Sequence, residues 1–516
     1  MNRYRLSICW ILATGAALHA GEEDTLPLYG TSFFATRSQG VNSALEALGW
    51  YQYINRIDRG LHVAFVVAPV YSQAYKTGRI AEYFFGTDTL TISGSTVPSR
   101  GDDDILADYF GLPTDYSSTV YLSPYLHNTL LDSALYIRYN GFYLYVHVPY
   151  AWAKSGITMH EEKGLTNDNA PYPQYYMAQG AVQPPAQSFK QAISGGYTWG
   201  NISPGLSFGK IAPNALHRHG VADVDVAIGW NFLRRERGIV GLALRFTAPT
   251  GNASTAEYLF EPMIGNGRHW EWGICFNAQG LIWEKDGEQT LNFVVQTNVT
   301  TMLNADEVRS FDLKRPNGFG SRYILAKQFD DNVYTGNTQP LINISTLPCK
   351  VRNAAQIDCT LMFAYEYMPY NACIGYNGWG RTGDGVTLTA CLPGDTWGLK
   401  GIVNEANALG LVPDTQSSAT LRGNFLSQQS MVVDSDSPVL ITSEQLDRHS
   451  GAASRNFTNK IFAYGNYTWC GPQMRVYPGL GLGFSVEFEG IRPKNVSPNK
   501  NNLSQWSVWL RGEVAF

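Results

Sequence analysis

The final segment of the chain alternates between hydrophobic and polar positions. One face of an extended strand would carry the apolar residues and one glycine: Trp506, Val508, Leu510, Gly512, Val514 and Phe516. The other face would carry Ser507, Trp509, Arg511, Glu513 and Ala515. A period of two that runs to a terminal phenylalanine is typical of a strand with lipid on one side and water on the other. An amphipathic strand of a soluble β-protein has the same period, so this segment alone leaves both interpretations open.

The same alternation recurs in five pairs of segments joined by short turns. These pairs occupy residues 133–152, 222–248, 270–299, 357–379 and 457–489. The clearest pair turns at Asn140-Gly141, and this dipeptide between alternating runs favours a hairpin because both residues tolerate positive φ. The strand before it could begin as early as Thr119. With strands at about 61–71 and 503–516, the pattern predicts about twelve strands, or fourteen if residues 321–328 contribute a further pair.

The connecting segments are sorted by length. The five hairpin turns are short, whereas the segments between hairpins are mostly long: 72–118, 153–221, 249–268, 300–352, 380–456 and 490–502. If the first strand starts in the periplasm, every short turn is periplasmic and every long segment is extracellular. A β-sandwich has no reason to sort its loops by strand parity, whereas outer-membrane barrels do. The predicted fold is therefore all-β, an antiparallel transmembrane β-barrel with short periplasmic turns and long extracellular loops.

The N-terminus has the layout of a secretory signal peptide. Arg3 and Arg5 precede a short apolar run over residues 6–18, and small residues follow around Ala20. This run is too short to span a bilayer, and no later run reaches the length of a transmembrane helix. We expect three parts: a signal peptide at 1–20, a periplasmic or plugging segment at 21–58, and the barrel at 59–516. Helical spacing in the second part predicts a short amphipathic helix that includes Val41, Ala44, Leu45, Leu48 and Trp50.

Composition narrows the chemistry. Only 16% of residues are charged and the net charge of −5 is spread along the chain, which argues against a nucleic-acid partner. Six cysteines lie beyond the signal segment, and Cys349–Cys359 or Cys373–Cys391 would close short disulfide loops, although spacing cannot establish the connectivity. There is no CxxC pair, so we expect no zinc site. We expect no cofactor.

Nine charged residues fall on the presumed inner faces of the strands. They are Arg138, Asp223, Asp225, Arg245, Glu271, Glu366, Glu487, Arg511 and Glu513. Such residues can line a pore and filter solutes by charge. They can equally form ion pairs that seal a narrow barrel, because small barrels fill with side chains whereas larger ones conduct.

The sequence gives little support to the hypothesis that the protein is an enzyme. The outer-membrane phospholipase class also forms a twelve-stranded barrel and needs a serine activated by a histidine that an asparagine holds. Residues 376–381 contain Asn-Gly but neither histidine nor serine, and His449-Ser450 lies in a predicted loop. His217 and His219 lack a nearby carboxylate or cysteine, which favours a solvated loop over a metal site. We therefore expect that the protein is not an enzyme.

The signal-like N-terminus, the sorted loops and the terminal motif together resemble Gram-negative outer-membrane β-barrel proteins of the porin or channel type. In that resemblance Gly512, Val514 and Phe516 match the C-terminal membrane-insertion signal. It implies an outer-membrane location and, as partners, outer-membrane lipid and lipopolysaccharide, the barrel-assembly machinery and small solutes, while the oligomeric state stays open.

The function that we expect from this resemblance is a porin-like channel for passive passage of small hydrophilic solutes, ion transport included. Two alternatives remain. One is a surface structural or adhesive barrel that acts through its long loops, and the other is a plugged transporter of hydrophobic compounds.

Overall fold

The computed structural model describes most of the chain from Arg37 onward. The described residues are 37–85, 87–94, 97–101, 104–113, 115–164, 186–199, 202–314, 320–331, 333–399, 440–469, 476–489 and 503–516. The predicted signal peptide at 1–20 lies outside them, and so does Cys470.

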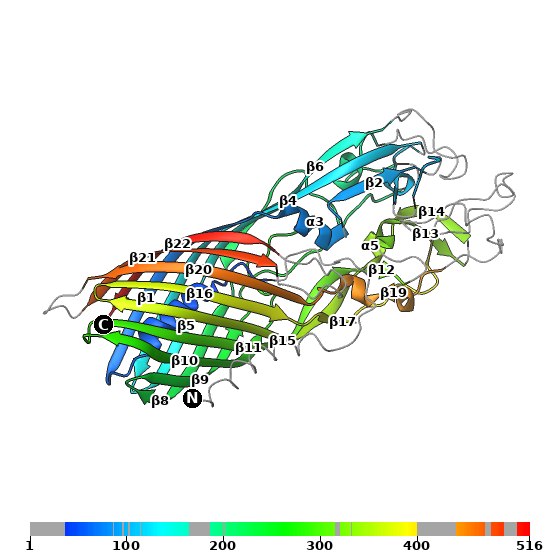
Figure 1. Ribbon diagram of the computed structural model, residues 1–516. Coiled ribbons are helices and arrows are strands. Elements are labelled where there is room, and N and C mark those ends of the chain that lie inside the picture. Colours follow the sequence, from blue (N-terminus) through cyan, green and yellow to red (C-terminus); the bar gives the residue numbers. More distant parts are fainter. Residues whose placement is uncertain are drawn as a thin grey trace, which may run out of the picture.

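Twelve antiparallel strands close into a barrel of the outer-membrane type (Figure 1). They are β1 (Leu61–Ala74), β4 (Ser117–Tyr139), β5 (Phe142–His147), β8 (Val224–Arg235), β9 (Gly238–Ala248), β10 (Glu271–Lys285), β11 (Gln289–Ser310), β15 (Thr346–Tyr367), β16 (Tyr370–Arg381), β20 (Asn456–Thr468), β21 (Tyr477–Glu489) and β22 (Gln505–Ala515). The first and last strands pair from Ala64↔Ala515 to Ala74↔Gln505 and thereby close the sheet. The predicted fold class and the count of twelve are confirmed.

The strand before Asn140 takes its longer predicted form, since β4 begins at Ser117. Asn140 and Gly141 have φ values of 48° and 96°, so the turn has the left-handed conformation that this dipeptide tolerates. Short turns join β4 to β5, β8 to β9, β10 to β11 and β15 to β16 at the periplasmic end. Two strands continue outward past the barrel wall: β6 (Tyr150–Lys163) follows β5, and β7 (Leu216–Val221) precedes β8.

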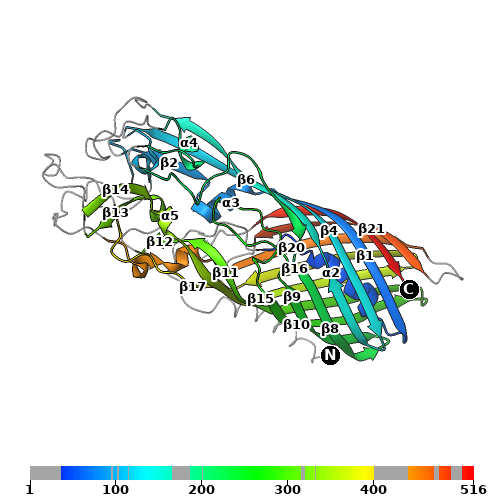
Figure 2. The same ribbon diagram turned by 180° about the vertical axis from the view of Figure 1, so that it is seen from behind.

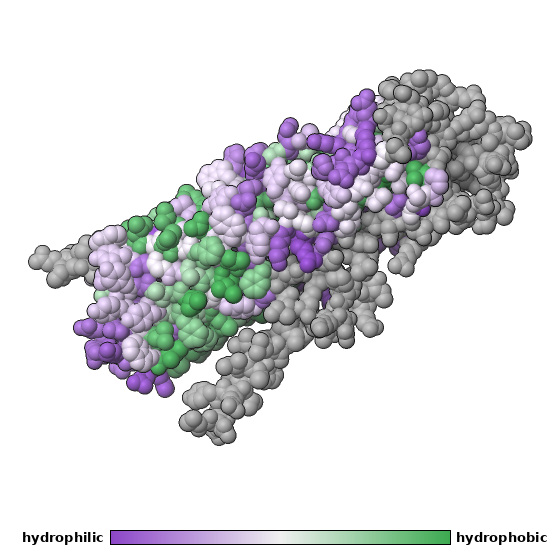
Figure 3. Space-filling view, turned by 45° about the horizontal axis from the view of Figure 1, so that its top comes forward, coloured by the Kyte–Doolittle hydropathy of each residue, from purple (hydrophilic) through white to green (hydrophobic). Residues whose placement is uncertain are grey.

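An apolar belt surrounds the barrel, and the space-filling view shows it as a green zone on the visible face (Figure 3). The final strand shows how it forms. Leu510 is 51% exposed to the exterior, whereas its neighbours Trp509 and Arg511 are buried in the interior. The predicted alternation of this strand is therefore present in the structure, and it produces a lipid-compatible outer face.

The long connections fold together into an extracellular domain (Figures 1 and 2). Its helices include α3 (Thr77–Phe85), α4 (Phe189–Ile193) and α5 (Ile342–Ser345), and its strands include β2 (Thr89–Ser93), β3 (Ile105–Leu106), β12 (Asp312–Leu313), β13 (Leu325–Asp330), β14 (Val333–Pro340), β17 (Asp384–Leu388), β18 (Trp397–Leu399) and β19 (Leu446–Asp447). One continuous apolar core holds these pieces, with Phe110, Phe189, Phe260 and Phe311 among its buried side chains.

The alternative of fourteen barrel strands is wrong. Residues 325–340 do form a strand pair, but β13 and β14 pair with each other and β13 pairs with β18 in a separate three-stranded sheet. In the barrel wall β11 pairs directly with β15, so no place remains between them for further strands.

The suggested disulfides are also wrong for the described cysteines. Cys349 and Cys359 are both free thiols on strand β15, ten residues apart and therefore roughly 30 Å apart, far beyond disulfide geometry. Cys373 is buried near the periplasmic end of β16, whereas Cys391 is exposed after β17 in the extracellular domain. The chain separations are short, but extended strands carry the thiols apart.

None of the helices in the described ranges has the length and apolar character needed to cross a membrane.

A charge introduced in the middle of the belt tests the assignment of the outer face. Leu482 is 58% exposed and pairs with Leu510 on the neighbouring strand. We expect Leu482→Arg to decrease the free energy of unfolding in lipid vesicles by about 2–4 kcal/mol, because a guanidinium at mid-bilayer loses its hydration. The measurement is denaturant titration of the refolded protein. Glu236→Arg, in the exposed turn between β8 and β9, is the control. Equal stabilities would contradict the assignment.

Candidate functional site

A helical segment occupies the barrel lumen (Figure 2). It consists of α2 (Ser43–Gly49) and a π-helical turn, η1 (Trp50–Ile54). The Asn42 side chain accepts a hydrogen bond from the Ala44 N–H and caps the helix start. Every residue of α2 is buried. We call residues 37–58 the plug segment, and the predicted amphipathic helix lies within it.

The plug segment packs against aromatic side chains of the wall. The Trp50 ring makes edge contacts with the rings of Tyr143 and Tyr145, with centroids 5.2 and 5.9 Å apart. Tyr136 lies against Gly49, where any Cβ would overlap its hydroxyl. Only glycine therefore allows the helix to approach the wall here. These inward tyrosines fill the space between the plug segment and the wall.

Ion pairs fix the plug segment along its whole length. They join Arg37 to Glu487 at 2.5 Å, Glu46 to Arg245 at 2.5 Å, Arg56 to Glu366 at 2.7 Å and Asp58 to Arg138 at 2.7 Å. The first of these lies near the extracellular ends of the strands, and the last two lie near the periplasmic turns. Buried charges need partners because the low-dielectric interior penalises an unpaired charge.

Glu46 is the central polar contact. Its Oε1 accepts hydrogen bonds from Arg245 at 2.5 Å, from Gln296 at 2.7 Å and from Asn298 at 3.3 Å. Arg245 also pairs with Asp225 at 3.0 Å. This one carboxylate thus connects the plug segment to two strands of the wall, at one position on β9 and two positions on β11.

The network extends further across the wall. The His147 imidazole lies 3.2 Å from Asp225 and 3.1 Å from Asp132. A continuous chain of charged and titratable groups therefore runs from Asp132 on β4 through β5, β8 and β9 to the helix. Sequence reasoning missed His147 and Asp132, although the alternation of β5 places His147 on the same inner face as Tyr143 and Tyr145.

The structure places all nine predicted inner residues on the lumen side. Seven are in ion pairs with one another or with the plug segment: Arg138, Asp225, Arg245, Glu366, Glu487, Arg511 and Glu513. Their role as a pore lining stays a prediction. The residues of the predicted insertion signal lie at the periplasmic end of β22, where Phe516 is exposed and its backbone pairs with Val63, while Gly512 and Val514 pair with Val67 and Phe65.

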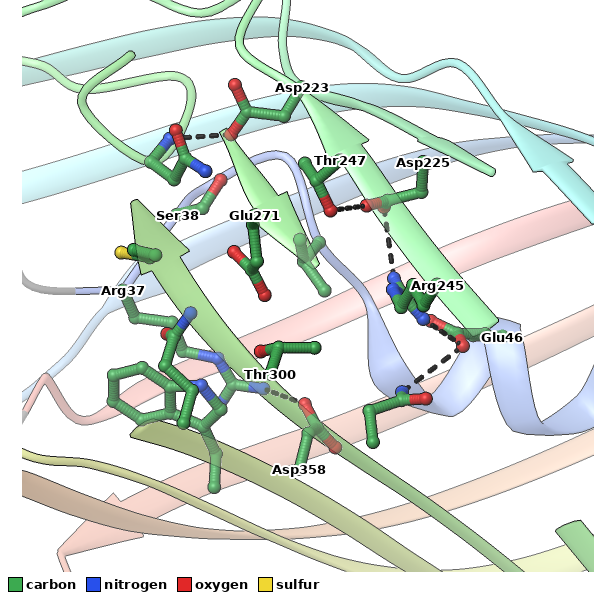
Figure 4. Close-up of a pocket in the computed structure, with 16 residues that line it drawn as sticks. Arg37, Ser38, Glu46, Asp223, Asp225, Arg245, Thr247, Glu271, Thr300 and Asp358 are labelled. Carbon is green, nitrogen blue, oxygen red and sulfur yellow. Dashed lines mark hydrogen bonds and ion pairs between the residues drawn. The ribbon is translucent and has the colours of Figure 1, made fainter. Parts of the chain in front are cut away.

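The two remaining carboxylates, Asp223 and Glu271, line a cavity of about 80 Å³ beside the plug segment (Figure 4). Asp223 accepts hydrogen bonds from the backbone N–H groups of Gly251 and Asn266 at 3.2 and 2.6 Å. The cavity is also lined by Asp225, Asp358 and Glu46 and by two cations, Arg37 and Arg245, so carboxylates outnumber guanidinium groups. Met302 and Trp379 add apolar surface.

Two of the side chains weighed for catalysis have structural partners. Asn377 donates hydrogen bonds to Asp358 and to the Thr360 hydroxyl inside the barrel. Ser450 donates to the Asp447 carbonyl at 2.6 Å and accepts from the Asp312 N–H at 2.7 Å in the extracellular domain. Across the described part of the chain, no three residues of the types His, Cys, Asp or Glu are grouped to hold a metal ion.

Comparisons with known proteins find similar structures but no related sequence family. No family model matches the chain, and no curated protein matches it. Similar solved structures include a FadL homologue of Pseudomonas aeruginosa, at 8% identity over 94% of this chain and 95% of the other, with a TM-score of 0.26. The Ralstonia pickettii toluene transporter TbuX matches at 8% identity over 94% and 97%, with a TM-score of 0.26.

A deletion mutant of the TodX monoaromatic hydrocarbon channel matches at 8% identity over 95% and 98%, with a TM-score of 0.28. At these scores the likeness carries no argument about the function of this chain. The assignment to outer-membrane-type barrels accordingly depends on the closed twelve-stranded wall and its apolar belt.

Removal of the central carboxylate tests how the plug segment is held. Cys275 is fully buried and packs with Trp50 and Ile54, so its thiol is a native reporter of plug release. We expect Glu46→Ala to accelerate modification of Cys275 by a polar maleimide roughly 100-fold, because loss of one partner of a buried ion pair costs about 3 kcal/mol. The modified peptide is quantified by mass spectrometry.

Glu257→Ala is the matched control, because Glu257 pairs with Lys210 at 2.9 Å on the extracellular domain. Its Cys275 rate should equal that of the wild type. Equal rates for Glu46→Ala and the wild type would show that the Glu46 contacts do not retain the plug segment.

Proposed function

We propose that the protein is a gated outer-membrane channel for small hydrophilic solutes, closed by its own plug segment. The observation that carries the proposal is the ionic attachment of residues 37–58 to the lumen wall at both ends and in the middle. A freely open passive pore, as expected from the sequence, would need this space. The structure shows the space filled by the helix and by the tyrosines around it.

The type of attachment favours a releasable closure. Besides the apolar packing of Trp50 and Ile54, ion pairs and amide hydrogen bonds hold the plug to the wall, such as Asn231 to the Ile54 carbonyl at 2.8 Å and Asn277 to Asn55 at 2.6 Å. Water can replace such contacts at small net cost, because a buried ion pair gains little over two hydrated ions. The plug segment belongs to no strand of the wall, so its displacement leaves the β1–β22 closure intact.

The cavity chemistry favours hydrophilic solutes over hydrophobic ones. Carboxylates and guanidinium groups converge on it, and an apolar solute would strip water from them without compensation. The proposed activity is transport without a catalytic step. Asn377 and Ser450 are the side chains that were compared with a hydrolase motif. Both are engaged in structural hydrogen bonds, which supports transport over catalysis.

Single-channel recording in planar bilayers tests this function. We expect the wild type to stay closed for most of the record and a deletion of residues 37–56 to conduct steadily, because the deletion empties the lumen. Glu46→Ala combined with Arg56→Ala should open intermittently, and this variant keeps the test valid if the deletion does not fold. A wild type that conducts continuously, or loosened variants that stay sealed at every voltage, would contradict the proposal.

A second candidate function is surface binding through the extracellular domain. The observation that favours it is the apolar core shared by the described parts of five long connections, since a barrel that serves only as a channel does not need a folded domain of this size. Such a domain presents a fixed surface to an external partner.

One pair of variants separates the two candidates. Phe311→Ala removes a fully buried ring of the extracellular core and should destabilise that domain by about 3–5 kcal/mol. If the domain mediates adhesion, cells displaying Phe311→Ala lose adhesion while the channel stays closed as in the wild type. Glu46→Ala should instead keep adhesion and increase conductance. Adhesion unchanged by Phe311→Ala would exclude the surface-binding candidate.

A further inference from the structure

The Arg37 guanidinium occupies a cation-binding site that the barrel wall builds. Its Nη1 lies 2.5 Å from Glu487 and donates to the Thr458 hydroxyl at 3.2 Å. Its Nη2 lies 3.6 Å from Asp358 and donates to Asn377 Oδ1 at 3.5 Å and to the Ser43 hydroxyl at 3.2 Å. The Trp379 ring lies beneath the guanidinium at 5.2 Å from its centroid.

The wall supplies the carboxylates and the ring of this site, and the plug segment adds the Ser43 hydroxyl, which donates to Asp358 at 2.6 Å. The wall groups come from four consecutive strands, β15, β16, β20 and β21, and the sheet register pairs Asp358 with Trp379 and Trp379 with Thr458. Asn377 donates to Asp358 and fixes its carboxylate. Since Trp379, Thr458 and Glu487 each lie two residues from the extracellular end of their strand, a solute from outside reaches this site early.

The charge of the wall requires a cation at this point. Among the described residues of the wall, one cation, Lys460, faces Asp358 and Glu487, and its Nζ lies 3.6 Å from Glu487. Without Arg37 the buried site would hold two carboxylates against one ammonium. A carboxylate pair beside an indole face is the combination that recognises guanidinium groups, through charge-assisted hydrogen bonds and cation–π attraction. The adjacent cavity continues the excess of carboxylates through Asp223, Asp225 and Glu271 (Figure 4).

We propose that this wall site is the binding site for a guanidinium-bearing solute, and that Arg37 is its internal stand-in. The solute replaces Arg37 against Trp379, Asp358 and Glu487, and the exchange frees the extracellular end of the plug segment. This inference rests on the proposed function, because it names the solute class that the closed channel admits and the contact at which opening begins.

Binding of arginine amide tests the proposal, with citrulline amide as the uncharged isostere. In detergent-solubilised Arg37→Ala, whose site is vacant, calorimetry should show arginine amide binding at least tenfold tighter than in the wild type. Citrulline amide should bind to neither. Trp379→Leu or Asp358→Asn, each added to Arg37→Ala, should weaken binding about tenfold. Glu257→Gln, next to the Lys210–Tyr258 cation–π pair of the extracellular domain, should leave it unchanged.

The wild type supplies an independent measurement if Arg37→Ala does not fold. Arginine amide should accelerate modification of Cys275, and citrulline amide should not. The proposal is overturned if Arg37→Ala binds no arginine amide, if Trp379→Leu and Asp358→Asn leave its affinity intact, or if the wild-type Cys275 rate is insensitive to it. If the plug deletion conducts but no binding is seen, only this inference fails. If binding is seen but every loosened variant stays sealed, the proposed channel function fails instead.

Discussion

The pairing of β1 with β22 is the constraint on which the rest of the structure depends. In a bilayer the backbone N–H and C=O groups have no water to bind, so a sheet edge exposed to lipid is not tolerated and the wall must close on itself. Closure with twelve strands sets an interior of limited width. That interior has to be filled, hydrated or bridged, and here the plug segment and the inward tyrosines fill it.

The helix brings charged groups into the confined lumen. The need to pair these charges explains why inward-facing positions of the wall carry charged and amide side chains. The carboxylate of Glu46 would be costly beside an apolar wall, but Arg245, Gln296 and Asn298 receive it from two strands. Arg245 in turn is shared with Asp225, which is shared with His147. The polar residues that alternate with the lipid-facing ones therefore form a connected lining whose charges are complementary to those of one particular segment.

Sequence patterns predicted the wall well because its information is local. Alternation along a strand determines which residues face inward, so Arg138, Arg245 and Arg511 could be assigned to the lumen from their neighbours alone. Their partners could not be assigned. Arg245 meets Glu46 across 199 residues of sequence, and Arg37 meets Glu487 across 450. The extracellular domain was hidden for the same reason, because Phe110, Phe189 and Tyr323 come from separate connections with no periodicity and meet only in the folded core.

The two ends of the plug segment differ in a way that gives the proposed gate a direction. At the periplasmic end Arg56 pairs with Glu366 and Asp58 with Arg138, next to the turns and close to the covalent link into β1 at Leu61. Chain continuity keeps these groups near each other after the contacts break, so they re-form readily. At the extracellular end of the described segment, the Arg37 side chain contacts a site of one indole and two carboxylates, which under the proposal a soluble cation can occupy in its place. Under the proposed function, release therefore starts outside and reclosure starts from the periplasmic tether, since the contact that a solute can replace and the contact that the chain itself restores lie at opposite ends of the same segment.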